Sequence, residues 1–549
     1  MSVHEIAYAS GTSTELLLGQ TIGQNLAATV DRFPDREALV VPFQDVRLTY
    51  AELAREVDRV ARGLMALGLQ RGDRLGIWSP NNAEWVLVQY ATAQVGVILV
   101  NLNPAYRTSE VAHALAQSGC RAVIAATTFK TSDYGAMLSQ IRSELPALER
   151  IVFLGTSDWD DLLAAGAAID DQALLAREAE LTFDDPINIQ YTSGTTGFPK
   201  GATLTHHNIL NNGYFVGEGC AYTEADRVCI PVPFYHCFGM VLGNLACTTH
   251  GAAIVVPAPA FEPVATLEAV EAERCTSLYG VPTMFIAELG LDDFDRYDLT
   301  SLRTGIMAGS PCPVEVMKQC IALMHMEQVT ICYGMTETSP VSTQTDVADP
   351  VDKRVGSVGR VHPHVEVKIV DPVTGRPVGR GESGELCTRG YSVMLGYWDD
   401  PERTAESIDS ARWMHTGDLA TMDDEGYLNI VGRIKDMVIR GGENVYPREI
   451  EEFLYGHPDI VDVQVIGVPD VRYGEELMAW VRVRPGATLT VDDVAGYCRG
   501  RIAHHKVPRY VHVVDEFPTT VTGKVQKFKM REEAIDLLGL QSAAGVDTA

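Results

Sequence analysis

Residues 191–202, YTSGTTGFPKGA, combine the residue types that bind phosphate groups. The alternating run INIQ precedes them, which predicts a strand that leads into a glycine-rich turn. Backbone N–H groups and hydroxyls in such a turn form a nest for phosphate oxygens, and Lys200 adds a positive charge. A simple polar turn has the same composition, so this loop alone leaves both interpretations open. The candidate phosphate ligands are Thr192, Ser193, Gly194, Thr195, Thr196, Gly197 and Lys200.

The order of residues around Lys200 disfavours one familiar phosphate loop. A Walker A loop has four residues between two glycines, the second of which is followed by Lys and then Ser or Thr. Here the lysine stands in the order Gly-Phe-Pro-Lys-Gly. The kinase or ATPase template is therefore disfavoured.

Other segments carry residues suited to nucleotide chemistry. In ICYGMTET, residues 331–338, Tyr333 supplies a flat ring for stacking and Glu337 supplies a hard oxygen for a cation such as Mg²⁺. PVPFYHCFGM contains His236, and VTGK ends at Lys524. Each residue has an ordinary alternative: a core histidine for His236, a turn carboxylate for Glu337 and a basic surface turn for Lys524.

Together and in this order, the segments resemble the motifs of the adenylate-forming (AMP-binding) superfamily. This superfamily includes acyl-CoA synthetases, nonribosomal adenylation domains and luciferases. The resemblance extends over nearly the whole chain and is strongest to medium- and long-chain fatty-acyl-CoA synthetases, including ILVNLNPAYRTSE at 98–110 and GELCTRGYSVMLGYW at 384–398. It implies ATP, Mg²⁺ and CoA as cofactors and a small carboxylic acid as substrate.

The resemblance also implies a role for each candidate residue. The loop would close over the β- and γ-phosphates of ATP, and the catalytic residues would be His236 beside the acyl pocket, Thr336 at the α-phosphate, Glu337 as the magnesium ligand and Lys524 as the adenylation lysine. Asp418 and Arg433 would lie at the ribose. Asp436 would be a hinge. The remaining nucleotide and CoA contacts would come from Ala308, Gly309, Ser310, Tyr333, Gly334, Gly441, Gly442 and Glu443.

The implied reaction joins a carboxylate to AMP, with release of pyrophosphate, and then passes the acyl group to the thiol of CoA. A carboxylic acid with a pKa of about 4.3 is ionised at pH 7, so the first step needs no general base. The second step requires that a thiol with a pKa of about 8.5 lose its proton, and no residue stands out as the base.

The aromatic segment at 231–240 has no acidic residue that would pair with the ammonium group of an amino acid. An apolar acid is therefore expected, with GMVLGNLAC and YGVPTMF as pocket walls, and a medium-chain fatty acid is favoured. The alternatives are a branched, aryl or steroid-derived acid, an acyl-AMP ligase that loads a carrier protein, and a silent ATP-binding protein.

The pattern of the chain indicates elements that would position these residues. Leucines and valines in 49–69 recur at helical spacing, with a capping box at Thr49 and Glu52. Alternating strands and helices predict an α/β fold with parallel sheets in a large layered N-terminal body. We expect a polar leader at 1–20, the large adenylation domain at 21–435 with a β-rich subdomain from about 365, and a small mobile α+β domain at 436–549.

Composition limits the function classes further. A chain of 549 residues with a formal net charge of −29 is not expected to bind nucleic acid or anionic membranes in general. Eleven cysteines lack metal-site spacing, which favours the cytoplasm, and we expect neither a signal peptide nor a transmembrane segment. The sequence leaves a homo-oligomer open.

Overall fold

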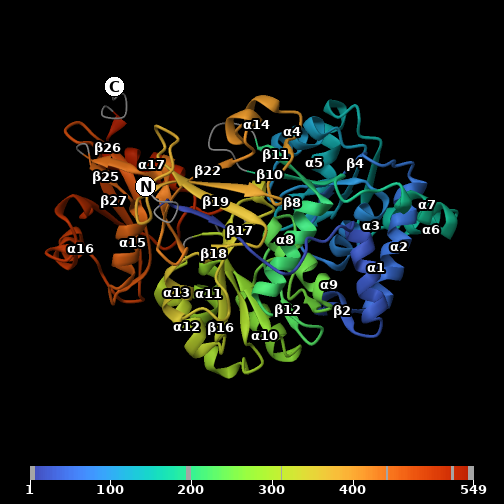
Figure 1. Ribbon diagram of the computed structural model, residues 1–549, viewed down its shortest axis with the longest axis horizontal. Helices are drawn as coiled ribbons and strands as arrows, with labels where there is room; N and C mark the ends of the chain where they lie inside the picture. Colours follow the sequence, from blue (N-terminus) through green and yellow to red (C-terminus); the bar gives the residue numbers. More distant parts are fainter. Residues whose placement is uncertain (1–5, 193–198, 311, 441–442, 521–524, 542–549) are drawn as a thin grey trace.

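Strands that alternate with helices build the large body, as the sequence pattern predicts (Figure 1). The computed structural model describes residues 6–192, 199–310, 312–440, 443–520 and 525–541. A seven-stranded sheet has five parallel strands, β10, β5, β4, β6 and β9. Next to β10, strand β11 runs antiparallel to it, and β21 in turn runs antiparallel to β11. Its strands, in spatial order, are β21 (Gly396–Tyr397), β11 (Lys200–Thr205), β10 (Pro186–Thr192), β5 (Ile98–Asn101), β4 (Arg74–Trp78), β6 (Ala122–Ala125) and β9 (Arg150–Phe153).

A nine-stranded sheet forms the second layer of the body. Its inner strands, β16 to β2, run parallel, and antiparallel strands close both edges. The order is β18 (Arg360–Val361), β17 (Val341–Gln344), β16 (Gln328–Gly334), β15 (Thr304–Ala308), β14 (Ser277–Gly280), β12 (Arg227–Cys229), β13 (Ala253–Val255), β2 (Glu37–Val41) and β3 (Val46–Thr49).

Helices pack on these sheets, and the predicted helix at 49–69 is confirmed. It is α2 (Tyr50–Ala66), which Thr49 and Glu52 cap as predicted. Its apolar stripe, including Leu53 and Val57, is buried in the main core. The other helices of the body are α1 (Ile22–Arg32), α3 (Ala83–Val95), α4 (Thr108–Ser118), α5 (Tyr134–Ile141), α6 (Ser157–Gly166), α7 (Asp171–Ala179), α8 (His206–Gly219), α9 (Ala246–His250), α10 (Pro263–Ala272), α11 (Pro282–Leu289), α12 (Val314–Leu323), α13 (Val351–Gly356) and α14 (Pro401–Ser407).

An antiparallel five-stranded sheet forms the predicted β-rich subdomain. Its order is β1 (Tyr8–Ser10), β19 (Val365–Val370), β20 (Gly384–Gly390), β22 (Met414–Met422) and β23 (Leu428–Arg433). Two features go beyond the sequence pattern. The segment predicted as a polar leader supplies β1, and β21 leaves the subdomain to extend the seven-stranded sheet.

The C-terminal domain has its own mixed sheet and apolar core, and it lies at one end of the body (Figure 1). The chain reaches it through a 3-10 turn at Ile434–Asp436, and that Asp436 acts as a hinge stays a prediction. Its elements are β24 (Val438–Arg440), β25 (Glu443–Val445), α15 (Pro447–Tyr455), β26 (Ile460–Asp470), β27 (Gly474–Val483), α16 (Val491–Cys498), β28 (Tyr510–Val513) and α17 (Lys527–Leu538).

Two further findings concern the chain as a whole. Within the described ranges, no helix is both long and apolar enough to cross a membrane. All eleven cysteines are buried and carry free thiols.

Candidate active site

The predicted phosphate loop joins two neighbouring antiparallel strands. β10 ends at Thr192 and β11 begins at Lys200, and these two residues are register partners. The strand pair therefore holds both ends of the loop. The loop residues Ser193, Gly194, Thr195, Thr196 and Gly197 lie outside the described residues.

Glu337 contacts the first end of this loop, and Tyr397 links it to the second end. Its Oε1 accepts a hydrogen bond of 2.8 Å from the Tyr397 hydroxyl and one of 3.4 Å from the Thr192 hydroxyl. The Lys200 ammonium lies 5.0 Å from the centre of the Tyr397 ring. Burial and, to a smaller extent, the nearby Glu337 carboxylate raise the pKa of the Tyr397 phenol. This hydroxyl therefore remains a donor at neutral pH. Three of these residues were predicted, and Tyr397 was not.

Close backbone packing fixes the turn that carries Glu337 and Thr336. A Cβ atom at Gly334 would lie 1.7 Å from the carbonyl oxygen of Pro340, so only glycine fits there. The Asn212 side chain on α8 exchanges two hydrogen bonds with the backbone of Val341, at 2.8 and 3.0 Å. Both Thr336 and Glu337 are buried. The turn is thus preorganised by α8, the helix that follows the phosphate loop and β11.

The environment of Glu337 fits a hard cation. The carboxylate is only 5% exposed, and its Oε1 is held by two hydroxyls. Among the described residues, none forms a hydrogen bond with Oε2. A carboxylate oriented through one oxygen offers the other to Mg²⁺, which prefers oxygen ligands. The residues present therefore fit the magnesium that the sequence predicts here.

Asp418 lies on a bulge in the antiparallel sheet. Between the pairs Glu385–Leu419 and Cys387–His415, β20 has one residue where β22 has three, so the ladder between these two strands is interrupted at 416–418. Asp418 Oδ2 accepts a hydrogen bond of 2.7 Å from the hydroxyl of Tyr333.

The other carboxylate oxygen of Asp418 also has a partner. Oδ1 accepts a hydrogen bond of 3.0 Å from Nε of Arg433, its register partner on β23. Burial and, to a smaller extent, the Asp418 carboxylate raise the pKa of the Tyr333 phenol. The predicted ribose and adenine residues thus form one connected group.

Residues 308–310 lie on the same side as Tyr333. β15 ends at Ala308, which pairs in parallel register with Cys332 of β16, and Gly309 turns the chain at a φ of +89°. In open α/β sheets, ligands bind beyond the carboxyl ends of parallel strands. Ala308, Gly309, Ser310, Tyr333 and Gly334 therefore lie at the edge where a base is expected.

Side-chain amides anchor the aromatic segment that contains His236. Asn81 bonds to the backbone of Val232 and Phe234, and Asn101 donates to the carbonyl oxygen of Tyr235. Nδ1 of His236 accepts a hydrogen bond from the N–H group of Phe238. The chain then continues as a buried π-helix, Phe238–Leu245, a form that is common at functional sites.

Comparisons with known proteins agree with this geometry. The model of the AMP-binding enzyme family matches residues 26–398, and that of the AMP-binding enzyme C-terminal domain matches residues 449–524. The chain belongs to the AMP-binding enzyme family.

Two curated relatives match this AMP-binding enzyme over almost its full length. The putative acyl-CoA synthetase YngI of Bacillus subtilis (strain 168) is 49% identical, and the match covers 96% of this chain and 99% of the relative. The mitochondrial medium-chain acyl-CoA ligase ACSF2 of Danio rerio is 47% identical, with 97% and 91% covered. The chain is an AMP-forming acyl-CoA ligase.

Solved structures support the assignment. The anthranilate CoA ligase AuaEII, in complex with anthranoyl-AMP, superposes with a TM-score of 0.87 at 26% identity, with 95% of this chain and 99% of AuaEII covered. ATP-bound MatB from Rhodopseudomonas palustris has a TM-score of 0.83 at 30% identity, with 94% and 100% covered. An AMP-binding enzyme of this kind uses ATP.

Four predicted residues are not tested by the contacts described above. Lys524, Gly441 and Gly442 lie outside the described residues. Glu443 is exposed at the start of β25, opposite Arg440. Their roles in this AMP-binding enzyme stay predictions.

Proposed function

We propose that this enzyme activates medium-chain fatty acids and transfers them to CoA. The observation that carries the proposal is the contact of Glu337 with Thr192, which brings the predicted metal ligand to the mouth of the predicted phosphate loop. The high identity to a medium-chain acyl-CoA ligase over nearly the full chain supports the substrate class.

In the first step, a carboxylate oxygen of the acid attacks the α-phosphorus of ATP, and the bond to pyrophosphate breaks. No proton has to be removed, because the acid is already ionised at neutral pH. We infer that Thr192, Lys200 and Lys524 stabilise the negative charge that develops on the phosphates. Glu337 would hold Mg²⁺, which supplies further charge neutralisation when bound.

Recognition of the nucleoside falls to the group around Asp418. Its carboxylate is only 7% exposed and is oriented by Tyr333 and Arg433. A buried carboxylate held in one orientation is suited to accept hydrogen bonds from the two ribose hydroxyls. The ring of Tyr333 would lie against the adenine.

In the second step, the thiol of CoA attacks the acyl carbonyl, and AMP leaves. The thiol must lose its proton, and among the described residues none is placed as its base. We infer that the C-terminal domain turns about Asp436 between the steps, exchanging Lys524 for the segment at Gly441, Gly442 and Glu443.

The side chains of the two predicted pocket walls favour an apolar acyl chain. The two predicted walls contact each other, since the Tyr279 hydroxyl donates to the carbonyl oxygen of Leu242. Phe238, the residue before the first wall, stacks on the Tyr279 ring at 5.6 Å. Met240, Leu242 and Met284 lie in the same buried cluster. Each buried methylene contributes about 0.8 kcal/mol, so the depth between these walls would select chain length.

An aryl acid is the second candidate substrate. The similarity to AuaEII, whose structure holds anthranoyl-AMP, favours it. Its identity to this chain is 26%, against 47% for the medium-chain ligase, which is why the fatty acid is preferred.

The decisive experiment measures acyl-CoA formation with ATP, Mg²⁺ and CoA across straight-chain acids of increasing length, with benzoate and anthranilate added. We expect a maximum at medium chains. Lys524→Ala should abolish it, whereas Lys529→Ala, which changes an exposed lysine on α17, should not. A maximum at an aryl acid would favour the second candidate. Adenylate without thioester would instead indicate a ligase that loads a carrier protein.

The compartment remains part of the proposal. Eleven buried free thiols are compatible with a reducing compartment, and we propose the cytoplasm.

A further inference from the structure

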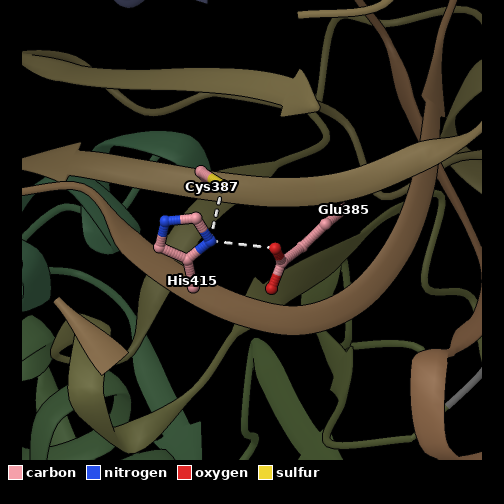
Figure 2. Close-up of side chains that lie close together, drawn as sticks. All are labelled: Glu385, Cys387 and His415. Atoms are coloured by element: carbon pink, nitrogen blue, oxygen red, sulfur yellow. Dashed lines mark hydrogen bonds and ion pairs between the residues drawn. The ribbon is translucent and has the colours of Figure 1, made fainter. Parts of the chain in front are cut away.

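Three metal-binding side chains meet on the antiparallel sheet, outside the group that forms the nucleotide site. Glu385 and Cys387 are two residues apart on β20, so their side chains point to the same face, and His415 is the register partner of Cys387 on β22. Figure 2 shows the three side chains pointing toward one another. One ligand atom from each lies within 4.8 Å of the others.

A single ring nitrogen is the centre of this cluster. Nδ1 of His415 lies 2.9 Å from Oε2 of Glu385 and 3.5 Å from Sγ of Cys387, as the dashed lines in Figure 2 mark. With metal–ligand bonds of about 2.0–2.3 Å, the ligand atoms of a tetrahedral zinc ion lie about 3.3–3.6 Å apart. The nitrogen–sulfur distance already matches that spacing, and the nitrogen–oxygen distance is shorter than it by a few tenths of an ångström. The oxygen and the sulfur lie within 4.8 Å of each other, so they would have to move closer on binding the ion.

Neighbouring groups contact two of the three side chains. Oε1 of Glu385 accepts a hydrogen bond of 3.1 Å from the N–H group of Gly417, which leaves Oε2 directed at the ring. On the far side of the imidazole, Oδ2 of Asp409 lies 3.9 Å from Nε2. A carboxylate that accepts a hydrogen bond from the second nitrogen is the usual support of a zinc-bound histidine, and Asp409 would have to move about 1 Å closer to form it.

Burial distinguishes this thiol from an accidental surface ligand. Cys387 is fully buried and packs with Val370 and Trp413, whereas the His415 side chain is 32% exposed. The Trp413 ring that packs on Cys387 also faces two cations, since Lys368 and Arg389 each lie 4.5 Å from its centre. Arg389 is also paired with Glu366.

We propose that Glu385, Cys387 and His415 bind one Zn²⁺ ion, or a similar borderline-soft divalent cation, with water as the fourth ligand. Thiolate, imidazole and carboxylate together are a donor set typical of zinc and poorly suited to Mg²⁺. Cys387 would bind as the thiolate and release its proton. This ion would be separate from the magnesium at Glu337.

The test uses the full-length enzyme with one equivalent of Zn²⁺ and an excess of Mg²⁺, so that sites with oxygen ligands alone are filled by magnesium. X-ray absorption at the zinc edge should show one sulfur at about 2.3 Å with nitrogen and oxygen ligands at about 2.0–2.1 Å. Zinc bound without sulfur, or no zinc bound, would overturn the proposal, and this result does not depend on any variant.

The absorption spectrum of the Co²⁺-loaded protein then shows which cysteine supplies the thiolate. A thiolate-to-cobalt charge-transfer band should appear in the wild-type protein and in Cys498→Ala, which removes a buried thiol of the C-terminal domain. It should be lost in Cys387→Ala, and the affinity for Zn²⁺ should fall by about two orders of magnitude in His415→Gln. A band that persists in Cys387→Ala would place the metal elsewhere.

Discussion

The hydroxyl of Tyr397 donates a hydrogen bond of 2.8 Å to Oε1 of Glu337, although the two residues are 60 positions apart. Glu337 lies in the turn between β16 and β17 of the nine-stranded sheet, and Tyr397 lies on an edge strand of the seven-stranded sheet. The contact therefore joins the two layers of the body at the predicted metal ligand. Because the Lys200 ammonium lies over the ring of Tyr397, one side chain contacts both the predicted metal ligand and the predicted phosphate-binding lysine.

Tyr397→Phe is expected to weaken the use of Mg²⁺ and ATP. The substitution keeps the ring beside Lys200 but removes the donor that orients Glu337. A hydrogen bond to a charged group contributes about 1.5–3 kcal/mol, so kcat/KM should fall by about tenfold or more. Initial rates at varied Mg²⁺ measure the effect. Tyr106→Phe, at another buried tyrosine, is the control and should change little. Equal losses in both variants would contradict the role of Tyr397.

Tyr333→Phe tests the group around Asp418. The ring would still be available for adenine, but Asp418 Oδ2 would lose its 2.7 Å hydrogen bond. The ribose acceptor would then be less firmly oriented, and the KM for ATP should rise by about tenfold while kcat changes less. Steady-state rates at varied ATP measure both constants. A fall in kcat alone, with unchanged KM, would argue against a role in nucleotide binding.

The alternation of strands and helices, and local features such as helix caps, could be predicted from sequence. The cap at Thr49 depends on residues three apart, and the strand before the phosphate loop depends on a local alternation. Tyr397 could not be predicted, because no local pattern reveals which strand β21 joins. The bulge beside Asp418 was equally hidden, since it is a mismatch between two strands rather than a property of either.

Asp436→Pro tests the predicted hinge. A proline there fixes φ and removes one degree of freedom between β23 and β24. We expect thioester formation to slow about tenfold or more relative to adenylate formation, if the two steps use different domain orientations. Single-turnover measurements of each half-reaction separate them, and Asp436→Ala, which leaves the backbone free, is the matched control. Normal rates for both half-reactions in the proline variant would count against the hinge.

Glu288→Met is expected to stabilise the protein. Glu288 is 1% exposed on α11, and neither of its carboxyl oxygens has a hydrogen-bond partner among the described residues. An unsatisfied buried polar group costs about 1–3 kcal/mol, which an apolar side chain of similar length avoids. Burial raises the pKa of Glu288 well above its usual value.

The raised pKa gives the prediction a pH signature. The folded protein keeps the Glu288 proton where the unfolded chain has lost it, so wild-type stability falls as the pH rises above about 4.5. The advantage of Glu288→Met should therefore grow between pH 5 and pH 8, until the pH passes the folded pKa. Denaturant unfolding across that range measures it, with Glu315→Met at an exposed, paired glutamate as control. A constant difference would mean that Glu288 does not titrate abnormally.

Acid should destabilise the fold through two buried histidines. Burial lowers the pKa of His206 to about 4 and that of His362 to about 3. Each ring has one nitrogen with a hydrogen-bonding neighbour: Nδ1 of His206 accepts from the N–H group of Ile22, and Nε2 of His362 lies 2.8 Å from Oε1 of Gln344. Neither interaction requires an imidazolium, so the folded protein keeps both rings neutral.

The sign of the effect follows from the unfolded chain, where histidine has a pKa of about 6.5. Stability is fully present above that value and falls as the pH drops toward 4 and 3, by about 1.4 kcal/mol per pH unit for each proton that only the unfolded chain binds. His362→Asn should reduce this slope by one proton whatever its effect at pH 7. Unfolding free energies between pH 7 and pH 5 measure the slope. His504→Asn, at an exposed histidine, should leave it unchanged, and an unchanged slope in His362→Asn would show that His362 is not held neutral.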